Sequence, residues 1–452
     1  MPPQEVSVNP FVLVFVLAMG VLMLMLPRRY ALVPFLLVAI FVPLGQCVVT
    51  MGLHFYMFRI MIMIGWIRVI VKSEYRSWQH NWVDDATLLT VLTGCTAYVI
   101  LWGTSDAVIN RLGMAFNAVG IYLLIRFLVR STKDWAVTLK ALAIMSVPVA
   151  AFMLVEFFTG RNVFAVFGGV PFITEIRDGR LRCQGPFMHP ILAGVFGAIL
   201  LPVFVSQIWL GRKQKMLTVI SVLASSAMTI TSACSGPILA AIAGVVGLCC
   251  WPLRRHMRLI RWGILSLIIA LQIAMKAPVY ALVGRVKVFN ASTGEHRFAL
   301  IDAYVHRFGE WWMLGTKTTA TWGYGLIDVT NMYVRVSVDG GLASLICFIA
   351  VIVFCFQGVG RAVRSAPEPK QQKVLWALGA SIFAAIVGFM DIQLFDQSVT
   401  IWYLLTGVIS ALAIQARHRA AAPAPKPVAV GEPVQPAELQ AQGELSRRLF
   451  AS

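Results

Sequence analysis

Apolar runs long enough to cross a lipid bilayer dominate this chain and constrain its fold more than any other feature. About thirteen such runs can be counted, at 11–26, 31–50, 54–71, 86–103, 112–129, 135–158, 190–210, 216–234, 236–252, 262–283, 340–359, 374–391 and 399–416. A helix needs about 20 residues to span the hydrocarbon core, where every backbone polar group must be satisfied within the protein. We therefore expect an all-α polytopic membrane protein with about 12–13 transmembrane helices.

The composition excludes the main soluble classes. Of the 452 residues, 59% are hydrophobic and only 13% are charged, whereas a soluble domain averages about 45–50% and about 25%. So few charges cannot cover a soluble enzyme or keep a chain of this length disordered. The eight cysteines lie mostly inside apolar runs, which excludes a disulfide framework and a CxxC metal site. We expect no metal ion and no cofactor.

The basic residues cluster in short loops between the runs and indicate the orientation of the chain. These loops lie at 28–29, 72–76, 130–133, 212–215, 254–261, 361–373 and 417–419. Because they form every second loop, the positive-inside rule places them and the C-terminus in the cytoplasm, with the N-terminus outside. The same rule accounts for the net charge of +18, so we expect membrane lipid and no nucleic acid as a partner.

The alternation of loops divides the chain into six segments. We expect N-terminal transmembrane helices at 1–158, a first outer loop at 159–190, central transmembrane helices at 191–283, a large outer loop at 284–339, C-terminal transmembrane helices at 340–416 and a disordered cytoplasmic tail at 417–452. Long connections in a compact protein usually carry function. The two outer loops are therefore the candidate site.

The first outer loop is rich in arginine on the side of the membrane where the positive-inside rule expects little. Arg177, Arg180 and Arg182 lie close together and are followed by His189. Arginine binds phosphate oxygens in bidentate geometry, so this loop predicts a site for an anionic lipid headgroup. Pairing of the arginines with the neighbouring carboxylates is the alternative, and His189, directly before a proline, also suits a helix cap.

The large outer loop contains an amphipathic pattern that predicts a helix at about 295–312. Arg297 and Arg307 on this helix are further candidates for binding the same anion. Ion pairs with Asp302 or Glu310 on their own helix are an equally reasonable interpretation.

Several short motifs in these loops, in this order, resemble the O-antigen ligase and O-antigen polymerase superfamily of bacterial envelope proteins. They are RCQGPFMHP at 182–190, Arg297 opening a helix, LG at 314–315, WGYG at 322–325, NMY at 331–333 and DGGL at 339–342. The resemblance covers most of residues 30–416. Each motif is short, so the order, the spacing and the sidedness carry the resemblance.

The resemblance implies a fold similar to the membrane-helical type C glycosyltransferases, with both outer loops in the periplasm of a bacterial inner membrane. It implies a metal-independent glycosyltransferase that uses an undecaprenyl-diphosphate-linked glycan and makes an exported surface polysaccharide. The diphosphate is the leaving group, and arginines stabilise the charge that it develops. A chain-length regulator or an export complex is the further partner that this reading implies.

The resemblance also implies roles for single residues. Arg182 and Arg297 match the family's arginines and would bind the diphosphate, and Asn331 matches the asparagine of the late loop. Ligases of the family place a histidine directly before that asparagine, as a base for the acceptor hydroxyl, but here the residue is Thr330. Threonine is no useful base at neutral pH, and this departure favours a polymerase over a ligase.

The general base is therefore left open among several side chains of the two loops. We favour Asp328, with His306 as a second catalytic candidate; the others are His296, Asp302, Glu310 and Glu175. The alternatives for the whole chain are an O-antigen ligase acting on a lipid A core acceptor, and a transporter or flippase that binds the same lipid-linked glycan without making a bond. A flippase of paired design would show internal symmetry, and we find no repeat.

Overall fold

The computed structural model describes residues 8–50, 53–211, 214–282, 291–395 and 397–421. The chain is 77% helical and has almost no sheet, which confirms the all-α polytopic architecture. Met1–Arg417 forms one compact unit and His418–Ser452 a second. Most of the predicted cytoplasmic tail, and the predicted boundary at 283–284, lie outside the described residues.

Each apolar run forms a helix over at least part of its length. The helices are α1 (Pro10–Met25), α2 (Leu32–Phe41), α3 (Met57–Val71), α4 (Trp82–Trp102), α5 (Ser105–Leu128), α6 (Thr132–Thr159), α7 (Pro190–Ser206), α8 (Lys215–Thr231), α9 (Ser235–Cys249), α10 (Met257–Ala274), α14 (Met332–Ser365), α15 (Pro369–Gly388) and α16 (Ser398–Ala421). Within the described residues, eight helices are long and apolar enough to cross a membrane, and α1, α8 and α9 are apolar but shorter.

The loops contain short elements of their own. The second and third runs are interrupted by a hairpin of β1 (Cys47–Thr50) and β2 (Leu53–Tyr56), so α2 and α3 are shorter than predicted. The first outer loop contains a hairpin of β3 (Glu175–Arg177) and β4 (Arg180–Arg182). The large outer loop contains α12 (Ala291–His306) and α13 (Phe308–Trp311), so the predicted amphipathic helix is present but is broken in two at Arg307.

Asparagine side chains determine where several helices begin. Asn81 accepts hydrogen bonds from Val83 and Asp84 and completes a capping box at the start of α4. Asn331 accepts from the backbone amides of Tyr333 and Val334. This cap explains why α14 begins at residue 332, eight residues before the apolar run that predicted it.

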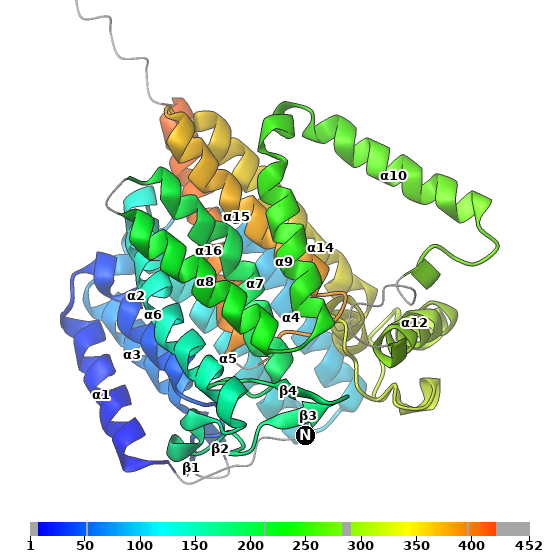
Figure 1. Cartoon of the computed structure of the whole chain (residues 1–452), viewed down its shortest axis with the longest axis horizontal. Helices are drawn as coiled ribbons and strands as arrows, with labels where there is room; N and C mark the ends of the chain where they lie inside the picture. Colours follow the sequence, from blue (N-terminus) through cyan, green and yellow to red (C-terminus); the bar gives the residue numbers. More distant parts are fainter. Residues whose placement is uncertain (1–7, 51–52, 212–213, 283–290, 396, 422–452) are drawn as a thin grey trace, which may run out of the picture. The chain divides into compact units, whose positions relative to one another are not determined.

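The loops gather at two opposite ends of the bundle, in the order that the charge pattern predicts. At one end, Arg28 binds Asp134 and Asn81 binds Ser410. At the other end, the backbone of Met332 binds that of Phe389, and Cys183 binds Thr231 in the same way. Consecutive helices therefore alternate in direction across the bundle, as Figure 1 shows.

The helices differ in how far they are enclosed. The segment Pro190–Trp209, which contains α7, is 83% buried over its apolar window, while α10 has no buried residue. Figure 1 shows α10 standing apart from the bundle, joined to α9 and to the large outer loop only through its two ends.

Helix α14 is broken near its start, and the large outer loop fills the break. Gly341 has a φ of 68°, and a side chain there would collide with the backbone of Met313. The amide of Leu342 donates to the carbonyl of Trp312 at 2.8 Å, and the amide of Thr316 donates to the carbonyl of Val338 at 2.9 Å. These bonds satisfy backbone groups that the kink releases from the helix.

Candidate active site

The first outer loop is anchored to α6 by a buried carboxylate. Glu156, near the end of α6, accepts hydrogen bonds from the backbone amides of Gln184 (3.2 Å) and Gly185 (2.8 Å) and from the hydroxyl of Thr174 (3.2 Å). Gly185 has a φ of 56°, and a side chain there would lie only 3.0 Å from the side chain of Met153. The turn at Gly185 therefore holds the β3–β4 hairpin at the outer-loop end of the bundle.

The β3–β4 hairpin places its charged side chains on one face. Glu175 is the cross-strand partner of Arg182, and Arg177 is the partner of Arg180. Side chains two positions apart in a strand share a face, so these four groups lie together. Arg177 is half exposed (52%) and lies 3.9 Å from Asp178.

Arg182 is the buried member of this set. Its Nη1 donates to Oε1 of Glu175 at 2.8 Å, and its Nη2 donates to the sulfur of Cys234 at 3.0 Å. Burial raises the pKa of Cys234 despite the nearby guanidinium, so the thiol stays protonated and donates to the carbonyl of Ser232 at 3.0 Å. Arg182 is therefore fixed against the connection between α8 and α9.

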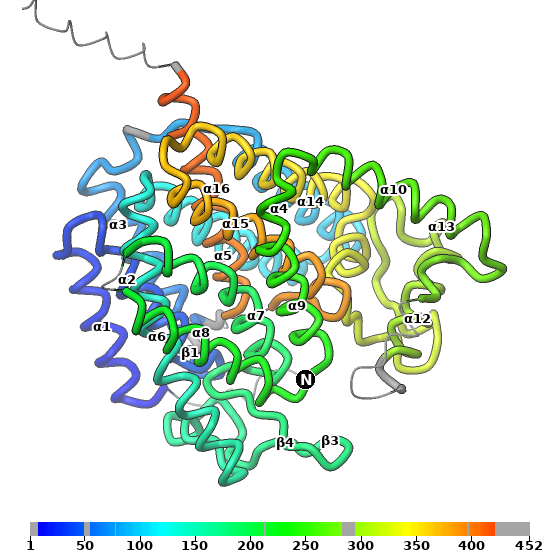
Figure 2. Tube along the Cα trace, turned by 45° about the horizontal axis from the view of Figure 1, so that its top comes forward, coloured from blue at the N-terminus to red at the C-terminus, as the bar shows by residue number. Residues whose placement is uncertain are grey.

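Arg297 reaches the next residue of that connection from the large outer loop. It lies on α12, is 5% exposed, and its Nη2 donates to the hydroxyl of Ser235 at 2.7 Å. Its Nε forms an ion pair with Asp391, which follows α15. Two arginines from different loops thus contact the consecutive residues Cys234 and Ser235. Figures 1 and 2 show the β3–β4 hairpin and α12 on either side of this end of α9.

Asp391 is held in a narrow space at the start of α9. A side chain at Gly236 would collide with its carboxylate. Burial raises the pKa of Asp391 to about 6, while Arg297, the amide of Gly236 and Arg182 favour the charged form. Burial is the largest of these effects, so Asp391 exchanges its proton close to physiological pH.

His189 is a neutral helix cap beside the arginines. Its Nδ1 accepts a hydrogen bond from the amide of Ile191 at 3.2 Å, at the start of α7. Burial, and then the charge of Arg182, lower its pKa to about 4, although Glu175 and Asp328 favour the protonated form. The interaction with Asp328 shows that the end of the large outer loop lies near the first outer loop.

The remaining predicted residues lie further out or hold structure. Arg307 forms an ion pair with Glu310 at 2.9 Å, as in the alternative interpretation of this helix, and its side chain is 37% exposed. His306 is 69% exposed and contacts the carbonyl of Asp302 at 2.8 Å. Neither side chain forms a hydrogen bond or ion pair with Arg182 or Arg297 in the described structure.

Asp328 and Asn331 both lie just before the start of α14 but have different surroundings. Asp328 is exposed, and its carbonyl lies 3.4 Å from Nε2 of His296. Asn331 is buried, caps α14, and its Nδ2 donates to the carbonyl of Met390 at 3.2 Å. Asn331 thus joins the large outer loop to the segment that carries Asp391.

Three groups that complete the site were not predicted from the sequence. Cys234 and Ser235 lie in a short connection between two apolar runs, and no motif or cluster of charges marks that connection. Asp391 had a detectable signal, because it is a lone carboxylate at the outer end of an apolar run, where an ionisable group marks a site by default.

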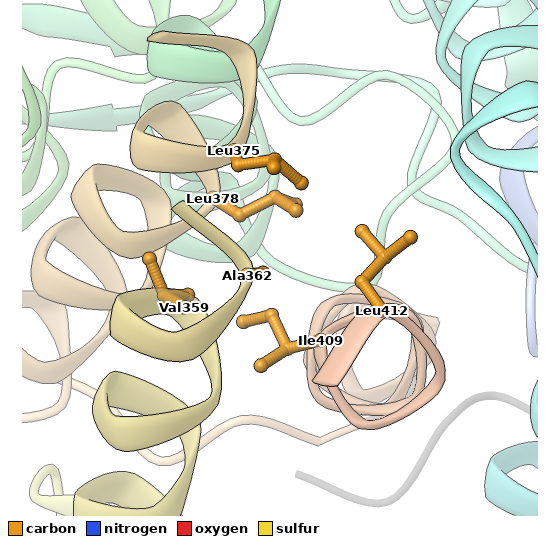
Figure 3. A pocket seen from close by; sticks show the side chains of 6 residues that line it. All are labelled: Val359, Ala362, Leu375, Leu378, Ile409 and Leu412. Atoms are coloured by element: carbon orange, nitrogen blue, oxygen red, sulfur yellow. The ribbon is translucent and has the colours of Figure 1, made fainter. Parts of the chain in front are cut away.

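Two other features bear on the chemistry. In the parts of the chain that the structure describes, no group of three or more His, Cys, Asp or Glu side chains is arranged to hold a metal ion. The pocket in Figure 3 is lined only by apolar side chains of α14, α15 and α16: Val359, Ala362, Leu375, Leu378, Ile409 and Leu412. It lies near the start of α15, whereas Asp391 follows the end of that helix, so it belongs to the packing of the opposite end of the bundle.

The fold and this site together define a polytopic α-helical membrane protein with two buried, ion-paired arginines where the two outer loops meet. No protein-family model and no curated protein matches the chain.

Proposed function

We propose that this chain is a glycosyltransferase that polymerises undecaprenyl-diphosphate-linked oligosaccharide repeats into an exported surface polysaccharide. The observation that carries the proposal is the convergence of Arg182 and Arg297 on Cys234 and Ser235. Two buried guanidinium groups at the end of a helical bundle suit a lipid-linked diphosphate, whose charge they neutralise without a metal. The motif resemblance described above is the second support.

The chemistry follows from the arrangement of charges. A hydroxyl of the acceptor attacks the anomeric carbon of the donor sugar, the bond from that carbon to the diphosphate oxygen breaks, and polyprenyl diphosphate leaves with the bonding electrons. Arg182 and Arg297 stabilise the negative charge on the leaving group. The hydroxyl proton passes to a base, and the exposed carboxylate of Asp328, near His189, is our candidate.

The membrane location is part of the proposal. Basic loops mark the other end of the bundle, and by the positive-inside rule they support an outer location for this centre and a cytoplasmic C-terminus. The motif resemblance supports the periplasmic face of a bacterial inner membrane. A chain-length regulator or an export complex is a proposed partner. A ligase would use the same centre with a lipid A core acceptor, and Thr330 in place of a histidine argues against it.

Arginine variants test this function in cells. Arg182→Gln and Arg297→Gln should each reduce long surface polysaccharide by on the order of 100-fold, the usual effect of removing a charge-stabilising donor. Arg258→Gln, an exposed change at the start of α10, is the matched control. The measurement is the size distribution of free and lipid A-linked glycans in cells with equal amounts of membrane-inserted protein.

Three results are informative. Loss of long free polysaccharide with intact lipid A decoration supports the polymerase. Loss of lipid A-linked glycan with accumulation of lipid-diphosphate-linked polymer would instead identify a ligase. Unchanged glycans in both arginine variants would refute the site.

A further inference from the structure

A second cationic cluster lies further along the first segment of α14. Arg111 on α5 contacts both carboxylate oxygens of Asp339, at 3.2 and 3.3 Å. Arg335, one turn before Asp339, binds the same carboxylate at 3.0 Å. Two guanidinium groups therefore share one carboxylate, and the cluster keeps a net positive charge.

The charges of this cluster exceed what a structural ion pair requires. Arg111 is only 8% exposed, and its Nε is buried without a hydrogen-bond partner. The bond between Thr316 and Val338 brings the neighbouring Lys317, also a cation, beside this part of α14. A buried donor without a partner is costly, and two guanidinium groups on one carboxylate leave a net positive charge that favours the binding of an anion.

Aromatic rings adjoin the cations. The guanidinium of Arg111 lies 3.6 Å from the centre of the Tyr98 ring, and Tyr98 stacks on Trp102 with centroids 5.5 Å apart. The ammonium of Lys317 lies 5.7 Å from the ring of Trp102, which is 36% exposed. Flat rings beside cations suit a sugar that carries a phosphate, because the ring packs on the sugar's apolar face while the cations bind the anion.

The cluster is close to the site of Arg182 and Arg297 but separate from it. Asn331 contacts Met390, next to Asp391, and Asp339 lies eight residues further along α14. At a rise of about 1.5 Å per residue, Asp339 lies about 12 Å along the helix from Asn331. Each centre contains two arginines from distant parts of the chain, but Arg182 and Arg297 each have a carboxylate of their own, whereas Arg111 and Arg335 share Asp339.

We propose that Arg111, Arg335 and Lys317 form a second diphosphate site, which holds the lipid-linked acceptor while Arg182 and Arg297 hold the donor. This inference rests on the proposed function, since a polymerase joins two lipid-diphosphate-linked substrates. The acceptor's glycan then bridges the two centres along the first segment of α14.

Counting bound lipids tests the proposal directly. The full-length protein, purified in detergent, is titrated with undecaprenyl diphosphate and examined by native mass spectrometry. The wild type should bind two molecules. Arg335→Gln, a change at a 40% exposed side chain, should weaken the second binding event at least tenfold and leave one molecule bound. Arg182→Gln should also leave one, and the double variant none.

Controls separate loss of the site from loss of the fold. Arg258→Gln should bind two molecules, and Lys317→Gln, at an exposed side chain, should weaken the second event without changing the melting temperature. Two molecules bound in Arg335→Gln and Lys317→Gln would overturn the second site. One molecule bound by the wild type and lost in Arg182→Gln would do the same but leave the proposed function standing. No binding by the wild type would overturn both.

Discussion

At the scale of residues, the two central arginines differ in how firmly their partners are held. Glu175, the partner of Arg182, is 44% exposed, whereas Asp391, the partner of Arg297, is 8% exposed. An exposed partner forms a weak, exchangeable pair, and a buried one is expensive to remove. We infer that an incoming diphosphate displaces Glu175, while Asp391 stays and orients Arg297.

Neutralising Glu175 should therefore favour the donor. In Glu175→Gln the diphosphate no longer competes with a carboxylate for Arg182, so affinity for undecaprenyl diphosphate should rise by about two- to fivefold. Titration of the purified protein measures this. Unchanged or weaker affinity would contradict the displacement, and Glu310→Gln, which changes an exposed pair elsewhere in the large outer loop, controls for net charge.

Asp391 predicts the dependence of activity on pH. Its pKa is raised to about 6, so its pair with Arg297 is present above that pH and is lost as the pH falls through 6. Activity should fall in the same window, and Asp391→Asn should remove this acidic limb while lowering the maximum. A pH–rate profile of both proteins checks the prediction; the same acidic limb in Asp391→Asn would contradict it.

Unfolding does not explain that expected loss. The folded chain takes up the Asp391 proton at a higher pH than the unfolded chain does. Protonation of this group therefore stabilises the fold as the pH falls from about 6 towards 4. Thermal unfolding in the same buffers separates the two effects, because the melting temperature should not fall on account of Asp391.

At the scale of elements, the connection between α8 and α9 is the part that positions the site. In this connection, Cys234 accepts a hydrogen bond from Arg182, and Ser235 accepts one from Arg297. Gly236, which has no side chain, leaves space for the Asp391 carboxylate. The helices thus act as a rigid frame, and buried polar contacts fix the two long outer loops to it.

Gly236→Ala tests this positioning. A methyl group there would collide with the Asp391 carboxylate and displace Arg297. A misplacement on the order of 1 Å costs roughly 100-fold in rate. Gly263→Ala on α10, where nothing lies within 4 Å, should have no effect on activity. Polymer formation by the two variants measures the difference. Equal activity would show that the Asp391 carboxylate can move away from the methyl group without displacing Arg297.

The sequence predicted the helices better than the contacts between them. Apolar length located every helix of the bundle over at least part of its length. The early start of α14 at the Asn331 cap was missed because its first segment, 332–340, is too polar to extend an apolar run. Arg182 and Arg297 were found through their loops, but the partner Asp391 depends on packing between distant helices, which no local pattern reports.

At the scale of the whole molecule, the described chain combines a bundle of apolar helices with the centre of Arg182 and Arg297 at one end. The loops that build this centre come from three separate parts of the sequence, around Arg182, Arg297 and Asp391. The chain's other basic loops gather at the opposite end. This separation suits a reaction on a lipid-linked substrate at one membrane face, with the energy already stored in the donor.

Reconstitution tests the central claim most directly. The purified chain in vesicles, supplied with undecaprenyl-diphosphate-linked repeats and no nucleotide, should form longer glycans and release one undecaprenyl diphosphate for each bond made. Arg182→Gln and Arg297→Gln should each slow both by on the order of 100-fold. Movement of the lipid-linked repeats across the vesicle membrane, with no new glycosidic bond and no released diphosphate, would contradict the account and identify a transporter.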